Sequence, residues 1–234
     1  MKVSYRFTII SALFVTCLVT ANIIAVKIFT IGFITLPAAV IIFPFSYIFG
    51  DILTEVYGYA MARRVIWLGF LCNLIFVVFA WVGQILPPAV FWQGQSGYVA
   101  ILGYTWRLLI ASFIAYVVGE FANSIIMARM KVWTKGKQLW TRTIGSTIVG
   151  EGLDSVIFIT VAFYATASFS GKLILQQWLA KVAIEVLATP LTYWVVNYLK
   201  KSEGSNVFDT HTNLNPFSFG AGKTNTDTVT TAKH

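Results

Sequence analysis

Six long apolar runs joined by short polar connections constrain this chain more than any other feature of its sequence. Several of them exceed the roughly 20 residues with which an α-helix crosses about 30 Å of hydrocarbon. The chain has 57% hydrophobic and only 11% charged residues, whereas soluble globular domains carry about 25% charged residues. The short alternating segments of a transmembrane β-barrel do not occur in the sequence. We therefore predict an all-α integral membrane protein, folded as one compact bundle of six transmembrane helices.

The six predicted spans follow from these apolar runs and cover approximately residues 7–29, 36–57, 65–86, 104–127, 143–167 and 175–199. The first run follows Lys2 and Arg6, as in a signal peptide, but it is longer than the apolar region of such a peptide. We therefore interpret it as a span. The connection at 87–103, which contains Pro87-Pro88 and several aromatic residues, is predicted to be a loop at the membrane interface.

Basic residues lie between the predicted spans, and their distribution predicts the orientation of the chain. With a cytoplasmic N-terminus, the outer connections contain only Lys27 and Lys172. The inner segments then contain Lys2, Arg6, Arg63, Arg64, Arg129, Lys131, Lys135, Lys137, Arg142, Lys200 and Lys201. Because basic residues concentrate on the cytoplasmic side of membrane proteins, we predict that both termini are cytoplasmic. The same distribution explains the net charge of +8 without a nucleic-acid partner.

The sequence divides into residues 1–201, the predicted six-helix domain, and residues 202–234, a polar tail on the cytoplasmic side. Residues 223–234 are rich in threonine and are predicted to be disordered. The preceding part of the tail contains Phe208, Phe217 and an Asn-Pro-Phe sequence. Such apolar residues exceed what a solvated tail needs, so the tail is a candidate for ordered packing against the inner face up to about residue 219.

Cysteine and histidine give no support for a metal or cofactor site. Cys17 and Cys72 lie within apolar runs, where we interpret them as small core residues. His211 and His234 both lie in the polar tail, whereas zinc sites need clustered His and Cys ligands. We therefore predict neither a metal nor a cofactor.

Six of the nine acidic residues fall within the predicted spans, and they are the main functional signal of the sequence: Asp51, Glu55, Glu120, Glu151, Asp154 and Glu185. A charge at the middle of a bilayer costs a few kcal/mol, so such residues usually face the bundle interior, form pairs or mark a solute path. Three spans each carry an acid followed by polar residues at i+3 and i+4, namely Asp51/Thr54/Glu55, Glu120/Asn123/Ser124 and Glu151/Asp154/Ser155. Residues at this spacing share one face of a helix. At about 1.5 Å per residue, the pattern predicts a solute site at or below the middle of the membrane.

Two of these stripes resemble each other beyond their spacing. Residues 119–126 read Gly-Glu-Phe-Ala-Asn-Ser-Ile-Ile, and residues 150–157 read Gly-Glu-Gly-Leu-Asp-Ser-Val-Ile. The two predicted helices are antiparallel, which is compatible with an internal repeat whose elements face one cavity. A match of eight residues can also arise by chance, so both interpretations stay open.

The polar residues in the spans also have structural interpretations. Asn22, Asn123, Ser124 and Ser155 could form hydrogen bonds between helices, which is the commoner use of such residues in membranes. Lys181 and Glu185, at i and i+4, could form an intrahelical ion pair, and Glu55 could reach water or pair with Arg63 or Arg64.

In the functional interpretation, buried carboxylates could accept two hydrogen bonds from an amidine-like edge, such as that of a guanine-type base, or could carry protons. Tyr47, which lies close to Asp51 in the sequence, could stack on a flat ring.

Several short motifs together resemble the queuosine precursor transporters, also called the vitamin uptake transporter family. They are Asp51-Ile-Leu-Thr-Glu-Val-Tyr-Gly58 with Ala62-Arg63-Arg64, Trp140-Thr-Arg-Thr-Ile-Gly-Ser-Thr147, Asp154-Ser155, Lys181 with Thr189-Pro190, and Asn215-Pro216-Phe217. The resemblance depends on the order and spacing of these motifs and covers about residues 22–219. It implies a six-helix protein of the bacterial inner membrane that takes up 7-deazaguanine precursors of queuosine. The main candidate is 7-cyano-7-deazaguanine, and its 7-aminomethyl relative is a second.

The resemblance also implies roles for matched residues. Asp51, Glu55, Asp154 and Lys181 are assigned to the substrate site or its coupling. The polar positions of the spans, and not the resemblance, add further candidate substrate residues: Asn22, Tyr47, Glu120, Asn123, Glu151 and Ser155. The candidates for the inner mouth or coupling are Arg142, Ser146, Thr147 and Glu185.

Two classes of uptake protein fit these observations. The first is a self-sufficient secondary transporter, with a homodimer as one possible form. The second resembles the substrate-binding S-components of energy-coupling-factor transporters, which need a partner module. Ala21-x-x-x-Ala25 permits close helix approach and looks like their docking motif, but the predicted bias of the acids toward the inside favours the first class. An intramembrane enzyme is disfavoured because the spans lack a Gly-x-Gly-Asp motif, His ligands and a phosphate-binding loop.

Overall fold

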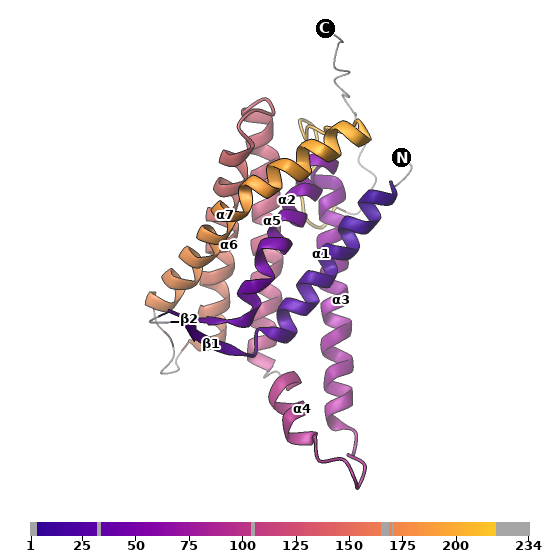
Figure 1. Cartoon of the computed structure of the whole chain (residues 1–234), viewed down its shortest axis with the longest axis vertical. Helices are drawn as coiled ribbons and strands as arrows, with labels where there is room; N and C mark the ends of the chain where they lie inside the picture. Colours follow the sequence, from indigo (N-terminus) through magenta and orange to yellow (C-terminus); the bar gives the residue numbers. More distant parts are fainter. Residues whose placement is uncertain (1–3, 32–33, 104–105, 165–168, 170, 219–234) are drawn as a thin grey trace.

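The computed structural model describes residues 4–31, 34–103, 106–164, 169 and 171–218. These residues form seven α-helices, one short 3-10 helix and a two-stranded antiparallel hairpin (Figure 1). In chain order the elements are α1 (Tyr5–Ile24), β1 (Ile28–Ile31), β2 (Ile34–Pro37), η1 (Ala38–Ile41), α2 (Phe43–Tyr57), α3 (Tyr59–Ile85), α4 (Gln95–Leu102), α5 (Trp106–Trp133), α6 (Leu139–Phe163) and α7 (Gly171–Glu203).

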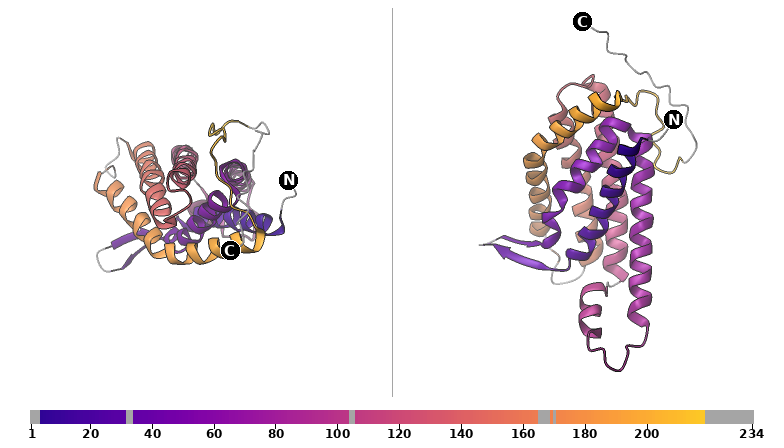
Figure 2. Two further views of the ribbon diagram at one scale, coloured as in Figure 1. Left: turned by 90° about the horizontal axis from the view of Figure 1, so that it is seen from above. Right: turned by 45° about the vertical axis from the view of Figure 1, so that its right-hand side comes forward.

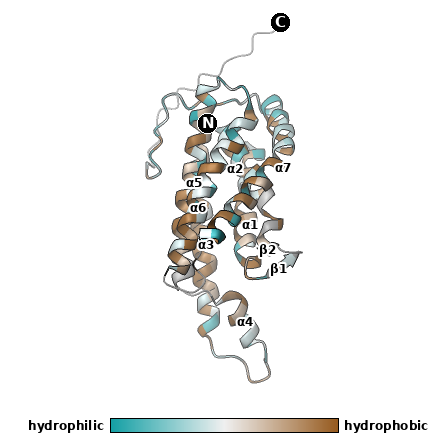
Figure 3. Cartoon of the chain, turned by 90° about the vertical axis from the view of Figure 1, so that its left-hand side faces the viewer, coloured by the Kyte–Doolittle hydropathy of each residue, from teal (hydrophilic) through white to brown (hydrophobic). Residues whose placement is uncertain are grey.

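Five of the described helices, α1, α3, α5, α6 and α7, are long and apolar enough to cross a membrane. Hydrophobic residues cover most of the lengths of these helices, and hydrophilic residues are more frequent at the end of the bundle where α7 finishes (Figure 3). The structure therefore fits an all-α membrane protein. The five helices agree with five of the six predicted spans, with shifted ends.

The second predicted span, at 36–57, differs most from the structure, because its helix is shorter than the other five. Its helix, α2, has only 15 residues and is therefore about 22 Å long at 1.5 Å per residue. Proline in its first turn marks the start of the helix, where the missing N–H has no helical partner to lose. The residues before it belong to β2 and η1. The α2 helix lies in the middle of the bundle and contacts α1, α3, α5 and α7 (Figure 1).

Two further elements depart from the predicted layout. The end of the first predicted span forms strand β1, which pairs with β2 in the register Phe29↔Leu36; isoleucine and threonine are frequent in both strands and favour extended backbone. The predicted loop at 87–103 contains α4, which packs on α3. There the Tyr98 hydroxyl donates to the Ala80 carbonyl at 3.1 Å. These tertiary contacts stabilise a helix of eight residues that would be marginal alone.

Helices α5 and α6 cross at very close range, and the crossing contains the two similar sequence segments. A Cβ atom placed on Gly119 would lie 2.9 Å from Asp154 Cβ, and one placed on Gly150 would lie 2.7 Å from Asn123 Cβ. Each glycine also faces the backbone carbonyl of the other, at 3.1 and 2.9 Å from those Cβ positions. Because equivalent residues exchange equivalent contacts, the two segments are related by a local twofold relation. The views in Figure 2 show these neighbouring helices from above and from the side.

Residues 204–218, called here the tail strap, cross the start of α3. The first residue of α3 has no side-chain cap from its own N-cap, Gly58. Instead, the Asp209 carboxylate, which lies 150 residues away in sequence, accepts a hydrogen bond of 3.0 Å from the Tyr59 N–H. A carboxylate at this place satisfies an unpaired helix donor and complements the helix dipole.

Two further side chains of α3 hold the tail strap by its backbone carbonyls. Arg63 donates to the carbonyls of Asn213 and Asn215, both at 2.9 Å. The Trp67 indole donates to the Pro216 carbonyl at 2.8 Å. The predicted disorder at 223–234 lies outside the described residues.

The close crossing of α5 and α6 generates a first prediction. Gly119→Ala should lower the free energy of unfolding by roughly 1–3 kcal/mol, because the added methyl group overpacks the crossing. Unfolding in mixed micelles, followed by circular dichroism, measures the change. The matched control is Gly97→Ala in α4, where an added Cβ meets no atom within 4 Å. Equal stability of the two variants would contradict the tight crossing.

The long-range cap on α3 generates a second prediction. Asp209→Ala should destabilise the protein by about 0.5–2 kcal/mol, since the Tyr59 N–H loses its partner. The neighbouring exposed residue provides the control: Thr210→Ala should change stability by less than about 0.5 kcal/mol. Thermal unfolding of both variants measures the difference, and an unchanged Asp209→Ala protein would show that the cap is not needed.

Candidate functional site

Glu55 is the centre of one buried polar cluster. Its side chain is fully buried, as is that of Arg142. The Arg142 guanidinium donates to both carboxylate oxygens of Glu55, with Nη2 at 2.9 Å from Oε1 and Nε at 3.2 Å from Oε2. This two-point geometry is the strong form of an arginine–carboxylate pair.

Two lysines complete the Glu55 cluster. Lys200 donates to Glu55 Oε1, and Lys131 Nζ lies 3.6 Å from the same oxygen. Lys131 also donates to the backbone carbonyl of Glu55 at 2.5 Å and to that of Val207 in the tail strap at 2.6 Å. One carboxylate therefore connects α2 with α5, α6 and α7.

These contacts overturn the pairing considered for Glu55 from the sequence. Arg63 binds the tail strap instead, and the described contact of Arg64 is to the Met61 sulfur. Glu55 does not reach water either, because it is 0% exposed. Sequence reasoning missed Lys131 because it placed this residue in a connection. The available signal was its position seven residues after Ser124, on the same face of a helix.

Lys181 is the centre of a second buried cluster. Its ammonium group lies 2.7 Å from Glu151 Oε2 and also forms a hydrogen-bonded ion pair with Asp154 Oδ2. Both acids lie on α6, whereas Lys181 lies on α7. The intrahelical pair with Glu185 that the i, i+4 spacing suggested is therefore wrong, and the lysine connects two helices instead.

Tyr47 and Glu120 border the Lys181 cluster. The acids around Tyr47 are Glu151, Asp154, Glu120 and Glu185. Glu120 also faces α2, since its Oε2 lies 3.9 Å from the position of a Cβ atom on Gly50. The stripes predicted on α2, α5 and α6 thus face a common interior.

Asp51 and Glu185 lie beside these clusters and have few partners. Asp51 is 1% exposed and Glu185 is 0% exposed. Asp51 Oδ1 accepts a long hydrogen bond of 3.5 Å from Asn123. Among the described residues, no hydrogen bond reaches Asp51 Oδ2, either carboxylate oxygen of Glu185, or the Ser155 hydroxyl. The acids around Asp51 are Glu185 on α7, Glu55 on α2 and Glu120 on α5.

The remaining candidates lie apart from the acids or support the helices. Asn22 donates to Asn73 at 2.6 Å and so connects α1 with α3. The Ser146 hydroxyl donates to the Thr143 carbonyl at 3.0 Å. Thr147 is buried on the same helix. Thr54 and Ser124 share a hydrogen bond of 2.9 Å that connects the stripes of α2 and α5.

The charges in this interior are unevenly balanced. Glu55 has three cationic partners, whereas in the described part of the chain Lys181 is the cation that pairs with the deeper acids. Those deeper acids are Asp51, Glu120, Glu151, Asp154 and Glu185. A carboxyl group in such surroundings must either hold a proton or, when ionised, have a cation or hydrogen-bond donors as partners. Across the described residues, His, Cys, Asp and Glu form no cluster of three that could hold a metal ion.

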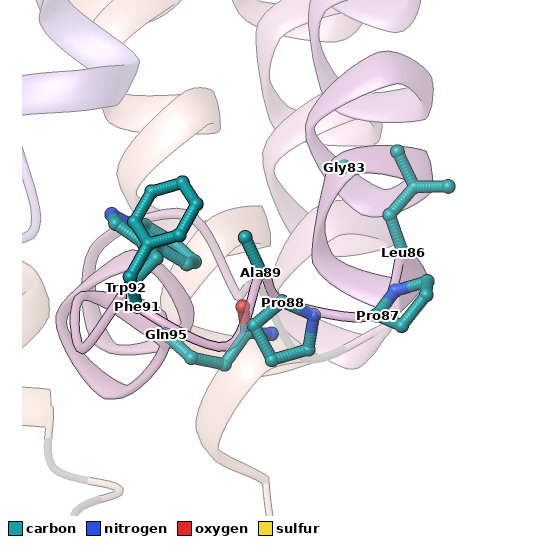
Figure 4. Close-up of a pocket in the computed structure, with 8 residues that line it drawn as sticks. All are labelled: Gly83, Leu86, Pro87, Pro88, Ala89, Phe91, Trp92 and Gln95. Carbon is teal, nitrogen blue, oxygen red and sulfur yellow. The ribbon is translucent and has the colours of Figure 1, made fainter.

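A separate pocket lies at the other end of α3, away from these acids. It has a volume of about 320 Å³ and is lined by Gly83, Leu86, Pro87, Pro88, Ala89, Phe91, Trp92 and Gln95 (Figure 4). Its lining is largely apolar and has no acidic residue. The acids that the sequence singled out therefore lie within the bundle, apart from this pocket.

The Glu55 cluster generates a third prediction. Glu55→Ala leaves buried cations without their carboxylate, which should cost roughly 3–5 kcal/mol in the free energy of unfolding. Denaturation in mixed micelles measures the loss. The control is Glu203→Ala, which removes a part-buried carboxylate that accepts a hydrogen bond from Ser4. The control should cost less than about 1 kcal/mol, and equal losses would argue against Glu55 as the central tie.

Comparisons with known proteins identify the family of this chain. The family model described as "Putative vitamin uptake transporter" matches residues 37–195. A protein of Bacillus subtilis named "Probable queuosine precursor transporter" is 28% identical over 160 residues, which are 67% of this chain and 69% of that protein. A protein of the same name from Haemophilus influenzae is 28% identical over 125 residues, or 53% of this chain and 51% of that protein.

The "Queuosine precursor transporter" of Escherichia coli is 25% identical over 122 residues, which are 52% of each chain. No solved structure matches the chain at a significant level. The family model covers more than half of the chain, and five described helices are long and apolar enough to cross a membrane. This chain therefore belongs to the vitamin uptake transporter family and is a multi-pass membrane transporter, of the inner membrane in bacteria.

Proposed function

We propose that this chain imports 7-deazaguanine precursors of queuosine, chiefly 7-cyano-7-deazaguanine, and that its buried carboxylates bind the guanine-like edge of the substrate. The 7-aminomethyl relative is a second candidate substrate. The names of the three relatives support the substrate class. The structural observation that supports the binding mode is the set of buried carboxylate oxygens without donors at Asp51 and Glu185.

The chemistry of the substrate matches these oxygens. A guanine-type edge presents two parallel N–H donors, and an ionised carboxylate offers two acceptor oxygens at a similar spacing. In a water-excluded interior, a ligand that lacks either donor leaves an acceptor unpaired, which costs about 1–3 kcal/mol. Lys181 supplies a cation for the carbonyl oxygen of the same base, and Tyr47 supplies a ring for stacking. Glu120, Glu151, Asp154 and Asn123 form the rest of the polar wall.

The Glu55 cluster is the proposed inner mouth. Its helix ends lie at the same end of the bundle as the described start and end of the chain (Figure 1). That end also carries Lys135, Lys137 and Lys201, which favours a cytoplasmic location by the distribution of basic residues. The proposal therefore retains six membrane-embedded helices, α2 included, and cytoplasmic termini.

The docking motif considered for an S-component does not favour that alternative. Ala21 is only 7% exposed within this single chain, so the first alanine of the motif packs inside the bundle, whereas Ala25 is half-buried. We therefore place a self-sufficient secondary transporter first, as a monomer or homodimer, and a substrate-binding subunit second.

Uptake by the chain alone tests this proposal. The host is a strain that cannot make the precursor, has no importer for it and has no energy-coupling module. Expression of the chain should restore queuosine in transfer RNA when 7-cyano-7-deazaguanine is supplied. Excess 7-deazaguanine should block uptake of the labelled precursor, whereas biotin, thiamine and riboflavin should not. Rescue that requires a coupling module would favour the S-component, and inhibition by one of the vitamins would overturn the substrate class.

Substitution of the buried acids gives a fourth prediction. Asp51→Asn and Asp154→Asn should each reduce queuosine rescue at least tenfold, because a tenfold effect corresponds to about 1.4 kcal/mol and each change replaces an acceptor by a donor. Glu203→Gln, at the end of α7, is the control and should rescue normally. Normal rescue by both Asn variants would remove Asp51 and Asp154 from the substrate site.

A further inference from the structure

We propose that Asp51 and Glu185 form a proton-binding carboxyl pair, and that its proton crosses the membrane together with the substrate. The first half of this inference concerns the protein alone, and the second half rests on the proposed function. The two acids lie on α2 and α7, two helices in direct contact, and Ile48 and Ile52 of α2 belong to the same buried cluster as Ala188 of α7. The pair gives the transporter a site for its driving ion that is separate from the ion-paired acids.

Burial without partners is the first observation. Asp51 is 1% exposed and Glu185 is 0% exposed. In the described part of the chain, three of their four carboxylate oxygens accept no hydrogen bond, and the fourth accepts only the 3.5 Å bond from Asn123. An ionised carboxylate removed from water without donors is among the most costly groups in a protein interior.

The charges on the surrounding helices form the second observation. The groups facing the pair are Glu55 and Tyr47 on α2, Glu120 on α5, and Glu151 on α6, with Asp154 also on α6 beside Tyr47. The nearby cations are already engaged: Lys181 with Glu151 and Asp154, and Lys131, Arg142 and Lys200 with Glu55.

Among the described residues of α1 and α3, on the other side of α2, no cation is shown to pair with Asp51 or Glu185. On α1 and α3, Asn22 binds Asn73. Arg6 donates to Ser202 at the end of the bundle, and Arg63 donates to the tail strap. The pair therefore lies in an excess of negative charge, which disfavours ionisation of both carboxyl groups at once.

One proton bound by Asp51 and Glu185 together removes most of the repulsion between the two carboxylates. Asp51 receives the Asn123 amide and can remain ionised, while the proton resides on Glu185 and can be donated to a carboxylate oxygen. The pair then carries one negative charge and keeps acceptor oxygens for the two donors of a guanine-like edge. Loss of the proton restores the repulsion and weakens substrate binding, so each ligand favours the other.

Helix α7 contains a proline close to Glu185. Pro190 lies inside this helix, where it removes one backbone hydrogen bond and favours a bend. The Thr189 hydroxyl donates to the Glu185 carbonyl at 2.8 Å, so side-chain bonding supplements the backbone ladder at the same turn. A bend here changes the distance between Glu185 and Asp51, which provides a route for the proton to leave the pair.

An infrared titration tests the pair without any substrate. The full chain is reconstituted in lipid, and the carbonyl stretch of protonated carboxyl groups is followed as the pH is raised. Wild-type protein should show a buried protonated carboxyl at neutral pH, and Glu185→Gln should lose that component. Glu203→Gln is the matched control and should retain it. A wild-type spectrum without the component, or a Glu185→Gln spectrum that keeps it, overturns the pair.

Transport in proteoliposomes tests the coupling. An alkaline interior should increase accumulation of 7-cyano-7-deazaguanine by wild-type protein at least tenfold over vesicles without a gradient. Glu185→Gln should lose this accumulation, whereas Glu203→Gln should keep it. The circular dichroism spectrum of reconstituted Glu185→Gln reports whether that variant is folded. Accumulation driven by a sodium gradient alone, or normal proton-driven accumulation by Glu185→Gln, overturns the coupling.

The two proposals fail in different ways. If wild-type protein exchanges no 7-deazaguanine, the proposed function fails, while the infrared titration still decides whether the pair holds a proton. If exchange occurs but no pH gradient drives accumulation, the substrate assignment remains and the coupling is rejected. The wild-type gradient measurements need no substitution, so a Glu185→Gln protein that does not fold leaves the proposal testable.

Discussion

The ion pair between Glu55 and Arg142 is the interaction on which the position of α2 depends. This helix is too short to be held by spanning the bilayer alone, so side-chain ties must fix its depth and rotation. Glu55 supplies those ties through Arg142, Lys131 and Lys200, and the Thr54–Ser124 bond adds one more. Asp51 lies one helical turn from Glu55. Its place in the interior is therefore set by a cluster whose central carboxylate and guanidinium are fully buried.

The crossing of α5 and α6 sets the other side of the same interior. Because Gly119 and Gly150 lack side chains, the two backbones approach closely and bring Asn123 opposite Gly150 and Asp154 opposite Gly119. Glu120 and Glu151 follow these glycines directly and so lie near the crossing. Lys181 then ties α7 to α6 at this depth. The similarity of the two segments thus has a structural consequence, since each segment supplies a glycine against which the other segment packs.

The sequence predicted which residues face inward more successfully than it predicted their partners. The i, i+3, i+4 stripes follow from helix geometry alone, and Asp51 and Glu151 are buried as expected, whereas the sequence left open that Glu55 reaches water. The partners of Glu55 come from α5, α6 and α7, and the cap on α3 comes from Asp209, far along the chain. Such pairs depend on tertiary approach, which local spacing does not encode. The strands at 28–31 and 34–37 were missed because their residues are as apolar as those of a membrane helix, so hydropathy could not separate the two.

The distribution of charge along α2 distinguishes the roles of its two acids. At Glu55 the cations are in excess, and the lysine that contacts this carboxylate also holds the tail strap through Val207. At Asp51 the acids are in excess and donors are few. Any opening at the Glu55 end must separate its carboxylate from at least one of three cations, and separation from Lys131 also disturbs the strap. In the proposed function, opening at this end would be opposed by these ion pairs, whereas the proposed ligand or proton at Asp51 would act one turn away on the same helix. Because this short helix carries both acids, the proposal implies that binding at Asp51 would be transmitted to the ion pairs of Glu55.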